Sequence, residues 1–108
     1  MPNDRNSTLH TLNKTAQHDS LNLKLSQTIS EGDAVILIED GVYQCLNIFS
    51  DHKPQNNPSW PNVSKSIYAL KDDALARGIQ SSVEGIVFVS YEEFVQLSLS
   101  HNKVISWY

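Results

Sequence analysis

Hydrophobic residues along the chain form short runs that are separated by polar turns. Two runs, AVILI at 34–38 and GIVFV at 85–89, are apolar or glycine at every position, which is typical of strands covered on both faces. Residues 66–70 (SIYAL) and 104–108 (VISWY) are also rich in β-formers. The alternation in Ser7–Leu12 predicts a further strand at the start of the chain.

The segment that follows the first predicted strand fits two structures. Leu21, Leu23 and Leu25 alternate as in a strand, whereas Leu21, Leu25 and Ile29 recur at the helical interval. Capping residues before the segment and a glycine after it favour the helix: Asp19, Ser20 and Gly32.

Three more helices are expected. Residues 42–49 (VYQCLNIF) place four side chains on one helical face: Val42, Cys45, Leu46 and Phe49. Residues 71–77 (KDDALAR) carry acids at the start and Arg77 at the end, as the helix dipole favours. Ser90 is expected to cap a helix that carries Phe94, Val95, Leu97 and Leu99.

Strands and helices therefore alternate along the chain. This order predicts an α/β fold with a mainly parallel sheet of about five strands and helices on both faces. Residues 1–108 are expected to form a single domain, with residues 1–6 flexible and residues 50–64 a loop rich in proline and asparagine.

Composition narrows the function classes. The 108 residues are 40% hydrophobic and 19% charged with a formal net charge of −4, values typical of soluble globular proteins. The eight lysines and arginines are scattered, so no basic stripe for direct nucleic-acid contact is expected. No signal-peptide core or membrane span is apparent, and a cytoplasmic location is expected.

No cofactor or metal site is expected. Neither a dinucleotide fingerprint nor a P-loop can be built from the four glycines, and the four histidines lie far apart with no metal-site spacing to the single cysteine. Adjacent acids that start helices are interpreted as capping and solvating groups: Glu39 with Asp40, Asp72 with Asp73, and Glu92 with Glu93.

Two residues invite a functional interpretation. Cys45 is the only cysteine, but it has no nearby basic residue and its helical spacing points it into the core, so burial is favoured over reactivity. Trp60 lies between two prolines in the 50–64 loop. It fits a partner-binding anchor and a cover for the core edge equally well.

Four segments carry a resemblance to a known family: Leu9–Thr15, Ser30–Tyr43 with its EDG turn, Ile67–Gly78 and Val89–Tyr108. In this order and spacing the chain resembles the DsrH/TusB family of sulfur-relay subunits, and within it the TusB branch.

The resemblance implies a DsrE/F-like fold and a place in a TusBCD-like heterohexamer with TusC-like and TusD-like subunits. TusA-like and TusE-like sulfur carriers are then indirect partners, and the end product is 2-thiolated wobble uridine in tRNA. The subunit implied is one without the essential thiol. The position where some relatives have a cysteine in the first helix reads Leu25 here.

The main hypothesis is therefore a non-catalytic subunit that helps to assemble a sulfurtransferase complex. Three alternatives stay open: persulfide acceptance on Cys45, a DsrEFH-type role in sulfur oxidation, and a free-standing binding module that uses Trp60. The candidate partner interface comprises Glu39, Asp40, Gly41, Trp60, Trp107 and Tyr108.

Overall fold

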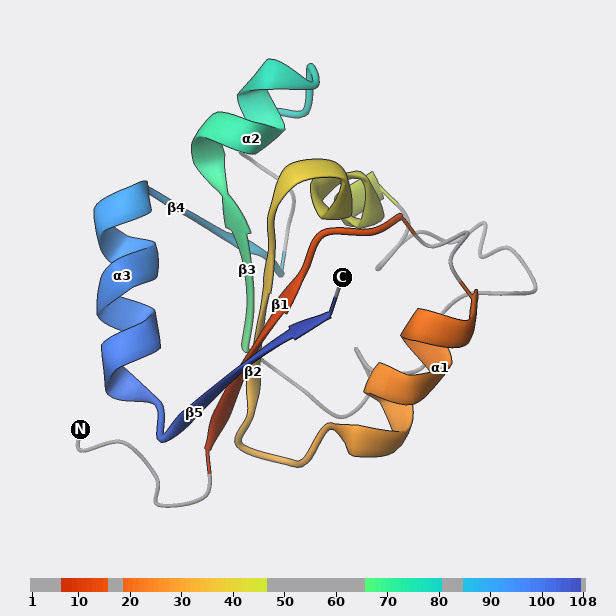
Figure 1. The fold of residues 1–108 in the computed structure, drawn as a ribbon. Helices are drawn as coiled ribbons and strands as arrows, with labels where there is room; N and C mark the ends of the chain where they lie inside the picture. The colour runs from red at the N-terminus through yellow and green to blue at the C-terminus, as the bar shows by residue number, and fades with distance from the viewer. Residues whose placement is uncertain (1–6, 16–18, 47–65, 81–84, 108) are drawn as a thin grey trace.

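The computed structural model describes residues 7–15, 19–46, 66–80 and 85–107. These residues contain a five-stranded sheet in the order β4-β3-β2-β1-β5, in which every neighbouring pair is parallel (Figure 1). The strands are β1 (Thr8–Leu12), β2 (Ala34–Leu37), β3 (Ser66–Leu70), β4 (Val87–Val89) and β5 (Lys103–Trp107). The predicted α/β fold with a parallel sheet is confirmed.

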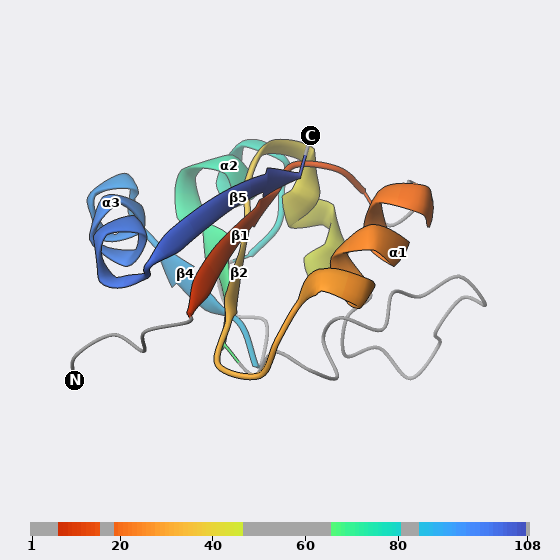
Figure 2. The ribbon, with the colours of Figure 1, turned by 60° about the horizontal axis from the view of Figure 1, so that its bottom comes forward.

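Between the strands, the described residues form four helices. They are α1 (Asp19–Thr28), the 3₁₀ helix η1 (Glu39–Leu46), α2 (Lys71–Ala76) and α3 (Tyr91–Ser100). Helix α3 covers one face of the sheet, and α1 and η1 cover the other (Figure 2). None of these helices has the length and apolar character that crossing a membrane requires, within the part of the chain described.

Side chains that alternate along the strands form two cores, one on each face of the sheet. Between the sheet and the helices α1 and η1 lie, among others, Leu12, Val35 and Leu37 of the strands, Leu25 of α1 and Val42 of η1. Beneath α3 lie Leu9, Ala34, Ile36, Ile38 and Val89, with Phe94 and Leu97 packed against them. The central strand β2 contributes to both cores, which explains why its sequence is apolar at every position.

Local signals fix several helix ends. The Ser90 hydroxyl accepts from the Glu93 N–H, and the Glu93 carboxylate accepts from the Ser90 N–H, so α3 begins with a complete capping box. These hydrogen bonds from Ser90 lower the pKa of Glu93. Gly78, with φ +74°, follows the C-terminus of α2.

The helix predicted for residues 42–49 is wrong in start and type. It begins at Glu39 and is a 3₁₀ helix. Three residues per turn place Val42 and Cys45 on one face but rotate Leu46 away, so the predicted burial of Leu46 fails and its side chain is 58% exposed. Phe49 lies outside the described residues.

The strand predicted for residues 85–89 is shorter and less covered than expected. It spans Val87–Val89 and lies at an edge of the sheet, where Val87 is 57% exposed. The unbroken apolar run at 85–89 correctly indicated a strand, but it did not reveal that this strand lies at the edge of the sheet. Residues 1–6, the 50–64 loop with Trp60, and Tyr108 lie outside the described residues.

Candidate functional site

The EDG turn lies at the carboxyl ends of the strands and starts η1. Glu39 adopts a positive φ of 49°, an uncommon conformation for a residue other than glycine. Gly41 packs directly on the backbone at the end of β1: a Cβ at this position would lie 2.0 Å from the carbonyl oxygen of Leu12. The glycine is therefore required by close packing between η1 and β1.

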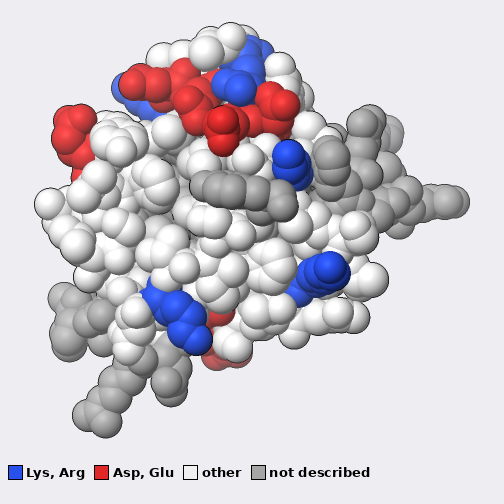
Figure 3. All heavy atoms as spheres, viewed as in Figure 1, with Lys and Arg blue, Asp and Glu red and all other residues white. Residues whose placement is uncertain are grey.

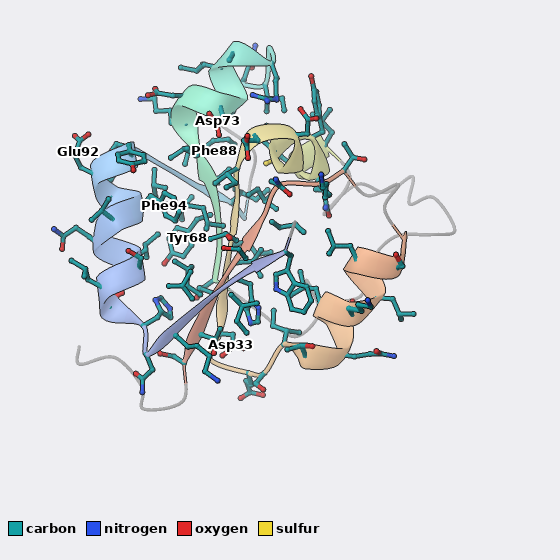
Figure 4. All side chains as sticks on the ribbon, viewed as in Figure 1. Asp33, Tyr68, Asp73, Phe88, Glu92 and Phe94 are labelled. Atoms are coloured by element: carbon teal, nitrogen blue, oxygen red, sulfur yellow. The ribbon has the colours of Figure 1, made fainter. Side chains whose placement is uncertain are left out.

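The acidic residues of this turn bind α2 within the same chain. The Glu39 N–H donates to Asp73 Oδ2 at 2.6 Å, and Arg77 Nε donates to Asp40 Oδ1 at 3.1 Å. Asp73 points from α2 toward the start of η1 in Figure 4, and acidic side chains gather over this end of the molecule in Figure 3. We call this contact the η1–α2 junction.

Cys45 lies on the inner face of η1. Its side chain is 3% exposed and belongs to the core cluster with Leu25 and Val42. Burial raises the pKa of the thiol to about 11, against a weaker opposing effect of a backbone hydrogen bond. At neutral pH Cys45 is therefore a protonated, enclosed thiol, unlike the exposed thiolates that act as nucleophiles.

A second polar group lies near the amino ends of the strands. His10 in β1 and Asp33 before β2 are 1% and 4% exposed, and His10 Nε2 lies 2.9 Å from Asp33 Oδ2. The same carboxylate accepts from the N–H groups of Thr8 and Ser30, each at 3.0 Å. Three donors therefore stabilise the buried charge of Asp33.

Trp107 determines the tautomer of His10. Its indole N–H donates to His10 Nδ1 at 3.0 Å, and the two rings stack with centroids 6.1 Å apart. Because Nδ1 accepts, the imidazole proton resides on Nε2 and is donated to Asp33. Both nitrogens of His10 are thus engaged, so this pair holds β1, β2 and β5 together rather than offering a free general base.

A cavity of about 420 Å³ opens beside this pair. It is lined mainly by polar residues from the start of β1, the turn before β2 and the start of β5, among them Thr8, Thr28, Ser30, Asp33, Asn102 and Lys103. Among the residues that the structure describes, no group of three histidine, cysteine or acidic side chains could hold a metal ion.

Three comparisons with known proteins fit this fold. A profile of the family described as DsrH-like protein matches residues 15–104. The chain belongs to the DsrH-like family. Proteins named Protein TusB are 32% identical in Pectobacterium atrosepticum, 33% in Pectobacterium carotovorum and 32% in Yersinia pestis, each over 92% of this chain and 99% of the relative.

A solved structure shares the fold of this DsrH-like chain. The crystal structure of ychN protein from E. coli superposes with a TM-score of 0.64 over 95% of this chain and 99% of that one, at 16% identity. At this identity the similarity concerns the fold alone.

The predicted interface residues of this DsrH-like chain occupy different environments. Glu39 and Asp40 are exposed but engage α2, and Gly41 is buried against β1. Trp107 is partly buried and bonded to His10. Trp60 and Tyr108 lie outside the described residues, and an interface role for the other four stays a prediction.

Sequence reasoning did not single out the His10–Asp33–Trp107 network. In the sequence His10 is one of four widely spaced histidines without metal-site spacing, whereas in the structure it is buried and bonded to Asp33. The available signal was the position of two polar residues within or beside apolar strands, His10 in STLHTL and Asp33 before AVILI. Such residues, when buried, need partners.

Proposed function

We propose that this chain is a non-catalytic subunit of a TusBCD-like sulfur-relay complex in the cytoplasm. It assembles with TusC-like and TusD-like subunits as a heterohexamer, receives no sulfur itself, and is required for 2-thiolation of wobble uridine in tRNA. Membership of the DsrH-like family and the relatives named Protein TusB support this role.

The state of Cys45 carries the non-catalytic part of the proposal. To accept sulfur as a persulfide, a thiolate attacks the outer sulfur of a donor persulfide, and the donor leaves as a thiol. With a pKa of about 11, roughly one thiol in ten thousand is ionised at pH 7. The chain has no second cysteine, and Leu25, at the position of a cysteine in some relatives, is fully buried.

Deletion of the gene combined with affinity purification of the tagged chain tests the assembly part. We expect TusC-like and TusD-like proteins to co-purify and 2-thiouridine to disappear from tRNA in the deletion strain. Normal thiolation without the chain contradicts the proposal. Loss of sulfur oxidation with normal thiolation instead assigns the chain to a DsrEFH-type pathway.

Mass spectrometry tests the non-catalytic part separately. The purified complex is incubated with a cysteine desulfurase, cysteine and a TusA-like carrier, and the mass of each subunit is measured. We expect added sulfur on the TusD-like subunit and none on Cys45. An added sulfur atom on Cys45 contradicts the proposal.

A further inference from the structure

The polar cavity at the amino ends of the strands lies away from the η1–α2 junction and from Cys45. Thr8 in β1 pairs in register with Lys103 in β5, and neighbouring residues of parallel strands project to the same face of the sheet. Both side chains therefore face the cavity, with Ser30 and Thr28 contributed by the end of α1 and the turn that follows. Its volume of about 420 Å³ lies in the range of small-molecule sites.

The acceptor atoms of Asp33 and His10, which line this cavity, already accept hydrogen bonds from within the chain. Asp33 accepts from Thr8 N–H, Ser30 N–H and His10, and His10 Nδ1 accepts from Trp107. A metal ion or an ammonium group would have to displace these buried hydrogen bonds, at a cost of several interactions. The carboxylate is therefore not available to bind a cation.

Donors at the wall and mouth of the cavity are available. Among the described residues, the hydroxyl groups of Thr8 and Ser30 and the ammonium group of Lys103 have no hydrogen-bond or ion-pair partner. A lysine ammonium offers three donors and each hydroxyl offers one. These three groups can thus donate to a ligand, and Lys103 contributes a positive charge in a cavity that it shares with the Asp33 carboxylate, whose oxygens already accept hydrogen bonds.

We propose that this cavity binds a small ligand with several anionic oxygens on one centre, a sulfur or phosphorus oxyanion, through Lys103 and the hydroxyl groups of Thr8 and Ser30. Charge-assisted hydrogen bonds from such donors are the strong contacts for an oxyanion. This binding is a property of the chain alone and does not depend on its partners. If the chain does not bind these anions, the proposed role in the sulfur-relay complex is unaffected. If that role is wrong, the chain can still bind the anions.

Heteronuclear NMR of the full chain tests the site. Sodium sulfate and sodium phosphate are added separately at pH 7, with sodium chloride at equal ionic strength as the reference. We expect saturable shifts of the Thr8, Ser30 and Lys103 amide signals with sulfate, phosphate or both, beyond those in chloride. The tighter-binding anion identifies the ligand class as a sulfur or a phosphorus oxyanion.

Two lysine variants give a matched control. Lys103→Met and Lys71→Met each remove one exposed positive charge, but Lys71 lies at the start of α2 and does not line the cavity. We expect Lys103→Met to weaken binding at least tenfold and Lys71→Met to change it less than twofold. Ser30→Ala, which retains the backbone N–H to Asp33, should weaken binding about threefold to tenfold.

Three results would overturn the proposal: shifts that equal those in chloride, shifts that do not saturate by 50 mM anion, or an equal effect of the two lysine variants. Because Lys103 is exposed, the variant should keep the wild-type spectrum outside the cavity, which shows that it is folded.

Discussion

The two ends of the sheet are built in opposite ways. At the carboxyl end, Glu39 and Asp40 are exposed and join η1 to α2 through surface contacts, while Gly41 provides the close packing beneath them. At the amino end, the charge of Asp33 is buried and held by three donors. Breaking a contact between exposed polar groups at the carboxyl end costs little free energy of unfolding. Leaving a buried polar group at the amino end without its partner costs much more.

This difference bears on where chemistry is expected. Parallel α/β sheets usually bind ligands at the carboxyl ends of the strands, and Cys45 follows β2 at that end. Here the thiol is enclosed and protonated, and the acidic residues at the start of η1 take part in the junction with α2. The cavity with available donors lies instead near the amino ends.

The largest effect is expected from Gly41→Ala. The added Cβ would meet the Leu12 carbonyl oxygen at 2.0 Å, and because backbone cannot move aside easily, the free energy of unfolding should fall by about 3 kcal/mol or more. Urea denaturation measures this. Gly78→Ala is the control: Gly78 has a positive φ but no atom within 4 Å of an added Cβ, so it should cost about 1–2 kcal/mol. Equal losses would show that close packing at Gly41 is unimportant.

Asp33→Asn should have the next largest effect. An amide is neutral and offers one oxygen where the carboxylate has two, so all three donors lose a charged acceptor and at least one of them loses its acceptor altogether. We expect a loss of about 2–3 kcal/mol in the free energy of unfolding. Glu31→Gln, an exposed change in the same turn, should stay within about 0.5 kcal/mol. If the two variants are equally stable, the buried network does not hold this end of the sheet.

Cys45→Ala should cost only about 1 kcal/mol at pH 7, because a small buried group is removed. The distinguishing feature of this variant is how its stability relative to the wild type changes with pH. The thiol pKa is raised from 9.0 to about 11 in the folded chain, so the folded state retains a proton that the unfolded state releases above pH 9. The wild type should therefore lose stability relative to Cys45→Ala as pH rises from 9 to 11. Parallel curves over this range would mean that the thiol is not buried as described.

Breaking the exposed ion pair should have the smallest effect. Asp40→Asn removes the charged partner of Arg77 at the η1–α2 junction, and exposed pairs contribute less than about 1 kcal/mol. A double-mutant cycle with Arg77→Met measures the coupling in urea. A coupling above about 2 kcal/mol would make the junction comparable to the buried network and remove the contrast between the two ends.

Much of the fold follows from local pattern. AVILI predicted a strand covered on both faces, and Ser90 with Glu93 marked the start of α3. These predictions succeeded because periodicity and capping depend on neighbouring residues. The predicted burial of Leu46 was wrong because the sequence pattern does not distinguish a helix of 3.6 residues per turn from one of 3 residues per turn, and η1 is of the second type.

The His10–Asp33–Trp107 network could not be assembled from the sequence for a different reason. His10 contacts Asp33 across 23 positions and Trp107 across 97, so these contacts depend on the strand order and on parallel pairing of β1 with both β2 and β5. Trp107, predicted to lie at a partner interface, donates its indole N–H to His10 within the chain, a contact that the sequence alone did not indicate.

Complementation of a deletion strain by Cys45→Ala tests whether this chain works without a sulfur-carrying thiol. The measurement is the ratio of 2-thiouridine to uridine at the wobble position of tRNA, with wild-type chain and empty vector as references and co-purification of partner subunits as the check on assembly. We expect no thiolation with the empty vector and at least 80% of the wild-type ratio with Cys45→Ala, since a loss of about 1 kcal/mol leaves most of the chain folded. A variant that assembles normally but gives no thiolation would contradict this expectation and assign the sulfur-carrying role to Cys45.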